Sequence, residues 1–408
     1  MDAILSAAAD LVANSEADLS VKGKAFCDLL TAEQWKVVRG KKVSNEVIAS
    51  IEELASAQHF SDKAHSRQRL YELAKIAKMG SALSSGQSLD PLVTELKQDI
   101  HVGANTPSAY ALLGACHIAG QHYERGVYYF NRANHIAART SCITGFMALA
   151  RSIPSLSVFD VDGDSVYSAD LEFVGKAEVF GAGAVSVVAG NSLYINRFID
   201  NYARSVAERS DGAFAGIHVH WVKDVGEHEA AIDQAMALAR SHGVAVNLTA
   251  ERVSDIVDKK SYYAQARFLI ARRLSVFYGS PLMITDLDFQ LCENPRAALT
   301  KLSLIDVSFL QHEPGTTMWA FPWLRSMAGS VWVNNTPKAR EFFRLVEQGF
   351  DACFNPTWFN WGIDQNLLTT VLEQMSRNSQ INFASMTKVS ERPLYDVPRD
   401  LKAGIKFQ

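Results

Sequence analysis

Two aspartates stand one residue apart at the end of a fully apolar run. The stretch PLMITDLDFQL, residues 281–291, places Asp286 and Asp288 directly after PLMIT. In an extended chain, side chains at i and i+2 point the same way, with Cα atoms about 7 Å apart. Two such carboxylates repel each other without a cation, and carboxylate oxygens suit Mg²⁺ or Mn²⁺. Because these ions bridge phosphate oxygens, the pair is predicted to hold a metal with a phosphate-bearing substrate; the alternative is a surface turn.

The elements that must position this pair form an alternating series of strands and helices. Helices are predicted over residues 196–209, 229–242 and 261–279, with glycines at 243 and 279 ending the last two. They alternate with apolar strands at 184–190 (AVSVVAG), 215–222 (AGIHVHWV), 244–249 (VAVNLT) and 281–285 (PLMIT). Such alternation predicts an α/β fold with helices flanking a largely parallel sheet. Ligands of open α/β sheets bind beyond the carboxyl ends of the strands, which is where Asp286 and Asp288 are expected.

Residues 1–150 have apolar side chains at helical spacing and are predicted to form an all-α domain. Within it, residues 108–138 resemble one tetratricopeptide unit, in which small residues let two helices approach closely. The matching residues are Tyr110, Leu113, Gly114, Gly126, Phe130 and Ala133. Because a stable array needs about three repeats, the flanking helices at roughly 45–80 and 85–100 are expected to supply degenerate repeats. A generic helical hairpin is the alternative.

Residues 151–180 are predicted to form a β-hairpin and linker, because SLSVFDVDGDSVYSADLEFVGKAEVF (155–180) alternates around an Asp-Gly turn. The same stretch is similar to the DxDG motif of haloacid-dehalogenase-type phosphatases, in which the first aspartate is the nucleophile and the second the acid/base. Asp160 and Asp162 fit those positions. Asp164 stands where that family has Thr, and no helix is expected to follow, so the hairpin is the simpler interpretation.

Four segments together resemble a GT-A glycosyltransferase over roughly residues 180–375. Residues 262–291 (YYAQARFLIARRLSVFYGSPLMITDLDFQL) match the helix and strand that end in the family's DxD motif. Residues 184–206 match the first strand and helix, residues 327–346 the strand that returns under the acceptor site, and residues 358–375 the Asp-Gln segment that opens a late helix. The resemblance implies a GT-A (Rossmann-like) mixed sheet in a transferase domain over 181–408, and a glycosyltransferase of the EC 2.4 class.

By resemblance, Asp286 and Asp288 bind Mn²⁺ or Mg²⁺ and, through it, the diphosphate of a nucleotide-sugar of the UDP or GDP type. Asp364 and Gln365 match the pair that faces the donor sugar or the acceptor. Asp364 would be a general base for the acceptor hydroxyl or would hold donor hydroxyls. It can also cap the helix over 365–375, and both roles are compatible.

The resemblance also implies which residues contact the donor. Gly329 and Ser330 match small residues that let the substrate approach the backbone, and Asn191 and Tyr194 follow the first strand, where the base or ribose would sit. Tyr263 and Arg267 lie one turn apart on the helix before the DxD motif. Arg267 would pair with the diphosphate, since Arg suits bidentate phosphate contacts. The alternative for Arg267, and the favoured interpretation for Arg272 and Arg273, is a solvated charge on the helix face.

One departure from the family concerns the third metal ligand. Many metal-dependent members add a late histidine, and the last histidine here is His312. His218 and His220 alternate along a predicted strand and are expected to pack there rather than bind metal. The missing ligand motivates an alternative function, a non-catalytic tetratricopeptide adaptor on a degenerate transferase fold.

Composition limits the partners and the compartment. The chain has 408 residues, 48% hydrophobic and 21% charged, with a net charge of −4, which argues against nucleic acid as the main partner. No basic n-region, apolar membrane span or CxxC pair is present, so a cytoplasmic protein with free thiols is expected. The expected partners are a nucleotide-sugar and an unknown glycan or protein acceptor. The helical domain is expected to bind a protein partner or a second copy.

Overall fold

The computed structural model describes two compact units. The described residues are 4, 6–7, 19–56, 64–103, 106–140, 153–160, 171–253, 256–357, 360–377, 380–390 and 392–397. The helical unit comprises Met1–Ser155 and His312–Arg325, and the sheet unit comprises Leu156–Gln311 and Ser326–Gln408. Among these described stretches, no helix combines the length and apolarity needed to cross a membrane.

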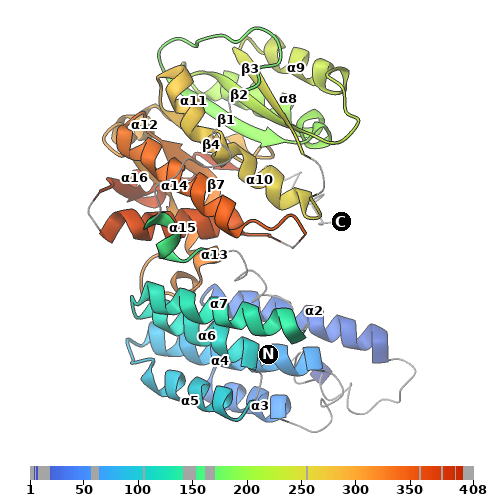
Figure 1. The fold of residues 1–408 in the computed structure, drawn as a ribbon, viewed down its shortest axis with the longest axis vertical. Coiled ribbons are helices and arrows are strands. Elements are labelled where there is room, and N and C mark those ends of the chain that lie inside the picture. Colours follow the sequence, from blue (N-terminus) through green and yellow to red (C-terminus); the bar gives the residue numbers. More distant parts are fainter. Residues whose placement is uncertain are drawn as a thin grey trace. The chain divides into compact units, whose positions relative to one another are not determined.

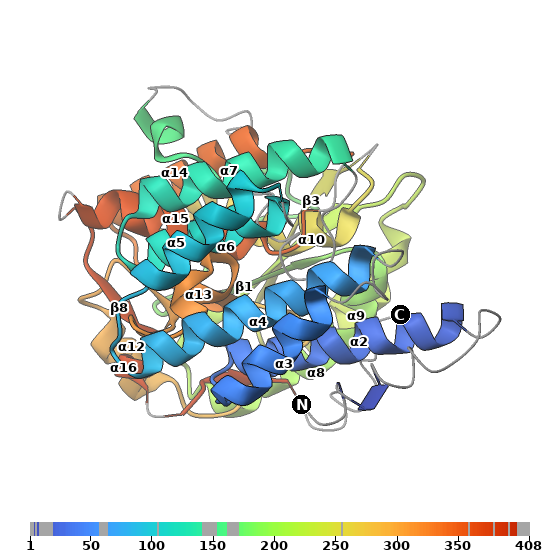
Figure 2. The same ribbon diagram turned by 90° about the horizontal axis from the view of Figure 1, so that it is seen from below.

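The helical unit is built around one long helix. Its elements are α2 (Leu19–Val38), α3 (Asn45–Ser56), α4 (Ala64–Ser84), α5 (Asp90–His101), α6 (Thr106–Ala119), α7 (Tyr123–Thr140), the 3-10 helix η6 (Met318–Ala320) and α13 (Pro322–Arg325). Helix α4 packs against α2, α3, α5 and α6. Figure 2 shows α2 and α3 on one side of α4, with α6 and α7 on the other. The predicted all-α character of this region is confirmed for its described residues.

Helices α6 and α7 form a tight hairpin whose closeness depends on two glycines. A Cβ on Gly114 would lie 2.8 Å from the Gly126 carbonyl oxygen, and a Cβ on Gly126 would lie 2.8 Å from the Gly114 carbonyl oxygen. Phe130 and Ala133 are buried beside this contact. The predicted close approach of the two helices is therefore present, while the assignment to the tetratricopeptide family stays a prediction.

The segment His312–Arg325 belongs to the helical unit, although the sequence analysis placed it in a continuous domain over 181–408. The physical reason is burial of its aromatic residues. Trp323 is buried, and its ring lies 5.4 Å from that of Phe130 in an edge-on contact, measured between centroids. Sequence spacing alone does not show which unit buries this segment, because its apolar residues Met318–Leu324 could pack against a sheet as well as against helices.

The sheet unit contains a seven-stranded mixed sheet (Figure 1). Its strands are β1 (Ala184–Gly190), β2 (Phe214–Lys223), β3 (Val246–Arg252), β4 (Leu282–Thr285), β6 (Val307–Gln311), β7 (Ser326–Val333) and β8 (Phe383–Ser385), in the spatial order β3-β2-β1-β4-β7-β6-β8. Only β7 runs antiparallel to its neighbours among these strands. Strands β5 (Gln290–Leu291) and β9 (Tyr395–Asp396) pair separately. The predicted α/β mixed sheet is confirmed.

Helices cover both faces of this sheet. One apolar core includes residues of α8 (Ser192–Arg209), α9 (Ala230–Ser241), α12 (Arg296–Leu302) and α16 (Met386–Val389). A second group of mutually packed helices consists of α10 (Lys259–Leu269), α11 (Ala271–Tyr278), α14 (Pro337–Cys353) and α15 (Ile363–Arg377). The helix predicted over 261–279 is thus two helices that meet at Ile270. Gly243 and Gly279 end their helices at φ of +78° and +62°, as predicted.

The stretch predicted to start a β-hairpin is not a strand. Leu156–Asp160 forms a 3-10 helix, η4, whose Leu156 and Phe159 side chains are buried. Phe173 makes only an isolated bridge to Thr249. Asp162 and the Asp-Gly turn lie outside the described residues. The prediction was wrong for 156–160 because burial of two apolar residues three apart suits a helical turn as well as a strand.

A fully buried carboxyl group lies in the core of the helical unit. Glu72 of α4 is fully buried, and it accepts hydrogen bonds from the Ser108 hydroxyl (2.6 Å) and the Gln68 amide (3.2 Å). The Gln34 amide donates to its other oxygen at 3.4 Å. Burial raises the pKa of Glu72 to about 7, although these donors and Arg69 act in the opposite direction. The folded protein therefore holds a proton that an unfolded Glu releases near its ordinary pKa of 4.5.

This linkage predicts a pH-dependent loss of stability. Because the folded-state pKa is raised, the stabilisation is present below the unfolded pKa and is lost as pH rises through about 7. Between pH 4.5 and pH 8, wild type should lose up to about 3 kcal/mol of unfolding free energy relative to Glu72→Gln, which cannot titrate. Urea unfolding followed by circular dichroism at several pH values measures this difference. Parallel curves for the two proteins would contradict the prediction.

Candidate functional site

Asp286 and Asp288 lie at the carboxyl edge of the central strand β4, where the sequence placed them. Leu287 between them is buried in the apolar core, which leaves the two carboxylates on the other side of the chain. The Asp286 side chain is 34% exposed. Its backbone N–H donates to the Gly329 carbonyl of β7 at 3.1 Å, so the first acid is fixed by a neighbouring strand.

Arg267 of α10 is buried beneath this edge and connects several elements. Its guanidinium Nη1 donates to Oδ1 of Asp286, and Nη2 donates to the Ala328 carbonyl at 3.1 Å. Nη2 also lies 3.9 Å from Oδ2 of Asp364. The interpretation of Arg267 as a solvated charge was therefore wrong. Its predicted pairing with a diphosphate stays a prediction.

A bulge in β7 brings backbone oxygens to Arg267 and Asp286. Phe309 pairs with Val331, but the next residue of β6, Leu310, pairs with Met327, so residues 328–330 have no partner in β6. Bulges of this kind turn a strand locally and are frequent beside active sites. Here the bulge supplies the Ala328 and Gly329 carbonyls that accept from the Arg267 guanidinium and the Asp286 N–H.

Gly329 is required at this bulge for steric reasons. A Cβ there would lie 2.8 Å from the Phe289 ring and 3.0 Å from Oδ2 of Asp286. The neighbours that exclude a side chain here are Phe289 and Asp286, and the prediction that Gly329 lets a substrate approach the backbone stays a prediction. Ser330, predicted beside it, is paired with Thr285, and its hydroxyl lies 3.7 Å from the Met283 sulfur.

Asp364 is the second residue of α15, directly after a turn. Gly362 adopts a left-handed conformation with φ of +81°, which lets the chain enter the helix. The Asp364 carboxylate accepts the Gln365 N–H at 2.8 Å and is only 12% exposed. Burial raises its pKa, and the positive charge of Arg267 partly offsets that rise. The helix-terminus role is present, and the carboxylate still borders the same cavity as Asp286 and Gln365.

Asp288 is paired with an aromatic hydroxyl. Burial, and then the negative charge of Asp286, raise the pKa of Asp288, while a hydrogen bond from Tyr194 acts in the opposite direction. Burial and the nearby carboxylates also raise the pKa of Tyr194. The Asn191 side chain caps α8 by accepting the Tyr194 N–H at 3.0 Å. Asn191 and Tyr194 therefore lie at the same edge as the two aspartates.

Asp224, which follows β2, is a member of this edge that the sequence analysis missed. Tyr263, predicted to contact the donor, places its hydroxyl 3.0 Å from both Asp224 carboxylate oxygens. Burial acts to raise the pKa of Asp224, but Lys259, Tyr263 and Asn191 lower it overall. The sequence signal was available, because Asp224 stands two residues after the predicted strand at 215–222, close to the same carboxyl edge as Asp286.

A cavity of about 110 Å³ opens among these elements. Its lining includes Arg267, Asp286, Gly329, Asp364 and Gln365, together with Trp361. Trp361 is 42% exposed and offers an aromatic surface beside the acids, a feature the sequence analysis did not assign. The predicted site residues from β4, β7, α10 and α15 are thus brought together around one space.

The histidines do not join this site. His218 contacts Tyr278 and Thr249 at 2.8 Å, and His220 contacts Thr249 at 2.9 Å, so the predicted packing role is confirmed. His312 lies in the helical unit. In the part of the chain that the structure describes, no three His, Cys, Asp or Glu residues are grouped to hold a metal.

The structure describes Asp160, the first aspartate of the stretch that is similar to the phosphatase motif. Asp160 ends the 3-10 helix η4 and is exposed, whereas the motif requires an aspartate that follows an apolar strand. Asp162 lies outside the described residues. The described part of the stretch therefore lacks the scaffold that a nucleophilic aspartate of that family requires.

Comparisons of the sequence with protein-family models and with curated proteins find no match. Solved structures that resemble this chain include the following two, and both likenesses are remote. Mouse xyloside xylosyltransferase 1, in its apo form, has a TM-score of 0.31 and 11% identity, covering 50% of this chain and 84% of that protein. The WbbM bifunctional glycosyltransferase, also apo, has a TM-score of 0.35 and 12% identity, covering 78% of this chain and 60% of that one. Both scores are too low to establish a common fold.

The crowding at Gly329 gives a prediction that compares two glycines. Gly329→Ala should destabilise the sheet unit by about 1–3 kcal/mol, because its Cβ would press on Phe289 and Asp286. Gly181→Ala is the matched control, since a Cβ there has nothing within 4 Å. Thermal unfolding of both variants measures the difference. Equal stability of the two variants would contradict the prediction, because it would show that the bulge accommodates a Cβ at position 329 without loss of unfolding free energy.

Proposed function

We propose that the sheet unit is a glycosyltransferase domain that moves a sugar from a nucleotide-sugar to an acceptor hydroxyl. The supporting observation is the arrangement of three carboxylates, on Asp286, Asp288 and Asp364, around one buried guanidinium at the carboxyl edge of the sheet. With all three ionised, Arg267 offsets only one negative charge. A substrate that carries its own cation, such as a metal-bound diphosphate, complements this surplus.

The residues at the edge fit a hard divalent cation with an incomplete set of protein ligands. Asp288 and the Oδ2 of Asp286 would hold Mn²⁺ or Mg²⁺, since Oδ1 of Asp286 is bonded to Arg267. The diphosphate and water would complete the coordination, because no third protein ligand is grouped there among the described residues. When bound, the cation would stabilise the negative charge of the departing nucleoside diphosphate.

The chain's own residues then take separate roles. Arg267 positions Asp286 through the bond from its Nη1, and its N–H groups that are not used for Asp286 and Ala328 would pair with the diphosphate. Asp364 accepts the proton of the acceptor hydroxyl, for which the raised pKa makes it a better base than an exposed aspartate. Gln365 borders the same cavity and faces the donor sugar or the acceptor.

The donor is proposed to be of UDP or GDP type. Its base and ribose would contact Asn191, Tyr194 and Tyr263 at the carboxyl edge of the sheet. These three side chains come from α8 and α10, next to Asp288 and Asp224. The acceptor, a glycan or a protein, approaches over Gly329 and Ser330. The helical unit is proposed to bind the acceptor, a protein partner or a second copy.

Asp288→Asn tests the metal role. Binding of UDP- and GDP-sugars in the presence of Mn²⁺, measured by calorimetry, should weaken at least about tenfold, because a neutral amide is a poor ligand for a hard cation. Wild-type binding should also weaken as pH falls, since protons compete for Asp288, whose pKa is raised. Asp233→Asn, an exposed aspartate on α9, is the matched control. Unchanged binding by Asp288→Asn would refute the assignment.

Asp364→Asn separates catalysis from binding. If Asp364 is the general base, kcat should fall by about 10²–10⁴ while donor binding changes little. The measurement is release of nucleoside diphosphate from the donor that binds most tightly, with candidate acceptors and with water. Loss of donor binding together with turnover would instead assign Asp364 to the donor.

The second candidate function is a non-catalytic adaptor. It is favoured by the absence of a third grouped metal ligand among the described residues and by the bond between Arg267 and Asp286. Wild-type protein that binds a nucleotide-sugar but releases no nucleoside diphosphate with any acceptor would support this function over the transferase.

A further inference from the structure

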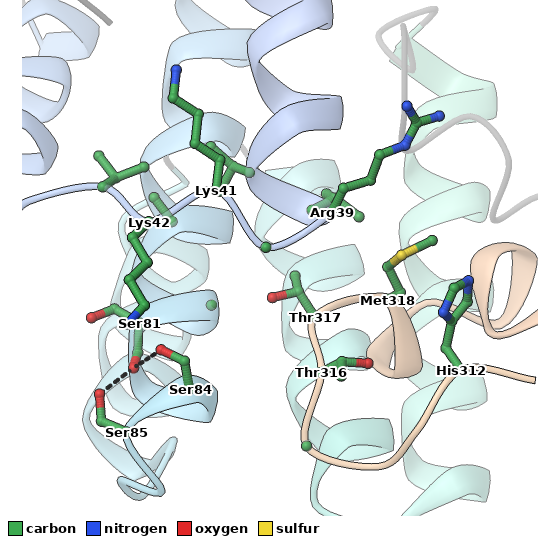
Figure 3. Close-up of a pocket in the computed structure, with 17 residues that line it drawn as sticks. Arg39, Lys41, Lys42, Ser81, Ser84, Ser85, His312, Thr316, Thr317 and Met318 are labelled. Carbon is green, nitrogen blue, oxygen red and sulfur yellow. Dashed lines mark hydrogen bonds between the residues drawn. The ribbon is translucent and has the colours of Figure 1, made fainter.

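The helical unit contains a cavity that the proposed transferase reaction does not use. Its volume is about 620 Å³, within the range of small-molecule sites. Three parts of the helical unit line it: residues 37–43 at the end of α2 and just beyond, residues between 77 and 85 at the end of α4, and residues between 312 and 318 (Figure 3). The cavity therefore lies within one compact unit.

The charges around this cavity are all of one sign. Its lining includes Arg39, Lys41 and Lys42 and contains no Asp or Glu. Lys41 is neutralised by Glu33, whose carboxylate lies 2.7 Å from its Nζ. Arg39 and Lys42 have no carboxylate partner in the described parts of the chain. Two uncompensated cations at one cavity, in a chain with a net charge of −4, favour an anionic ligand.

The end of α2 presents these cations. The Lys41 N–H donates to the Lys36 carbonyl at 2.9 Å, and the Gly40 N–H donates to the Val37 carbonyl at 3.0 Å. Gly40 has φ of +97°. These bonds form a Schellman motif, which ends a helix by turning the chain through a left-handed residue. The motif fixes where Arg39 and Lys42 leave the helix, so the cations stand on an ordered turn.

The facing walls carry hydroxyl groups. Figure 3 shows Lys42 extending beside α4 toward Ser81, with the Thr317 hydroxyl turned toward the same space. Helix α4 and this segment approach closely, because a Cβ on Gly80 would lie 3.0 Å from the Thr317 Oγ1. The Ser84 and Ser85 hydroxyls both donate to the Ser81 carbonyl. Those two hydroxyls already donate, so the donors offered to phosphate oxygens are the Lys42 ammonium and the Ser81 and Thr317 hydroxyls.

The uncharged residues of the lining indicate what kind of group the anion is attached to. Val37, Val38, Ala77 and Met318 give an apolar surface suited to the C–H faces of a sugar ring. The lining contains no Phe, Tyr or Trp, the large aromatic side chains on which proteins stack the bases of single-stranded nucleic acids, and His312 supplies its single aromatic ring. We propose that this cavity binds a phosphorylated saccharide, with its phosphate at Lys42, Ser81 and Thr317 and with Arg39 adding positive charge at the rim.

The experiment uses the full chain and calorimetry. Mannose 6-phosphate represents a free sugar phosphate, pentamannosyl phosphate represents a saccharide chain with a phosphorylated end, and mannose is the neutral reference. Wild type should bind at least one phosphorylated probe at least tenfold more tightly than mannose, and the affinity should fall as salt rises. Tighter binding of the pentasaccharide would assign the cavity to phosphorylated chain ends, and tighter binding of the monosaccharide to free sugar phosphates.

Variants locate the binding. Lys42→Gln and Arg39→Gln change exposed side chains and should each weaken binding of the phosphorylated probe, by about tenfold for Lys42→Gln. Lys97→Gln removes an exposed lysine of α5 outside the cavity and should have no effect. Asp288→Asn should also bind normally, which separates this site from the transferase proposal. Equal binding of phosphorylated and neutral probes by wild type, or unchanged binding in Lys42→Gln, would overturn the proposal.

Discussion

The buried guanidinium of Arg267 is the interaction on which the candidate site depends. A charge removed from water must be matched by nearby opposite charge and by hydrogen bonds, or the fold loses several kcal/mol. Arg267 finds its partners in three other parts of the chain: Asp286 after β4, the Ala328 carbonyl in β7, and Asp364 at the start of α15. Its Nε has no hydrogen-bond partner among the described residues. Satisfying one cation therefore sets the relative positions of α10, β4, β7 and α15 at the carboxyl edge.

The same requirement explains the local departures from regular structure around the edge. In the β7 bulge, residues 328–330 have no partner in β6, and the Ala328 carbonyl accepts from Arg267 instead. Gly329 removes the side chain that would otherwise meet Phe289 and Asp286, and the left-handed Gly362 starts α15 so that Asp364 lies near Arg267. These three irregularities thus support the same ion-pair arrangement around Arg267. One guanidinium does not balance the carboxylates of Asp286, Asp288 and Asp364, and the excess negative charge is what a cation-bearing substrate would need.

Much of the fold followed from sequence patterns, because local chemistry decided it. The strands at 184–190 and 281–285 are apolar throughout and bounded by polar turns, and Gly243 and Gly279 end helices for steric reasons. Long-range pairing was not accessible in this way. Neither the partner of Arg267 nor the β7 bulge leaves a local signature. The 3-10 helix at 156–160 was mistaken for a strand because five residues carry too little periodicity to decide.

The excursion of His312–Arg325 has a consequence for how the protein can be divided. The chain passes between the two units at residues 155–156, again at 311–312 and again at 325–326. The fourteen residues from 312 through 325 are in effect the loop between β6 and β7, and their closure entropy is offset by burial of Trp323 among the helices. The helical unit is therefore not a detachable module. Removing residues 1–155 would expose Trp323, which lies in the connection between β6 and β7 and packs against Phe130.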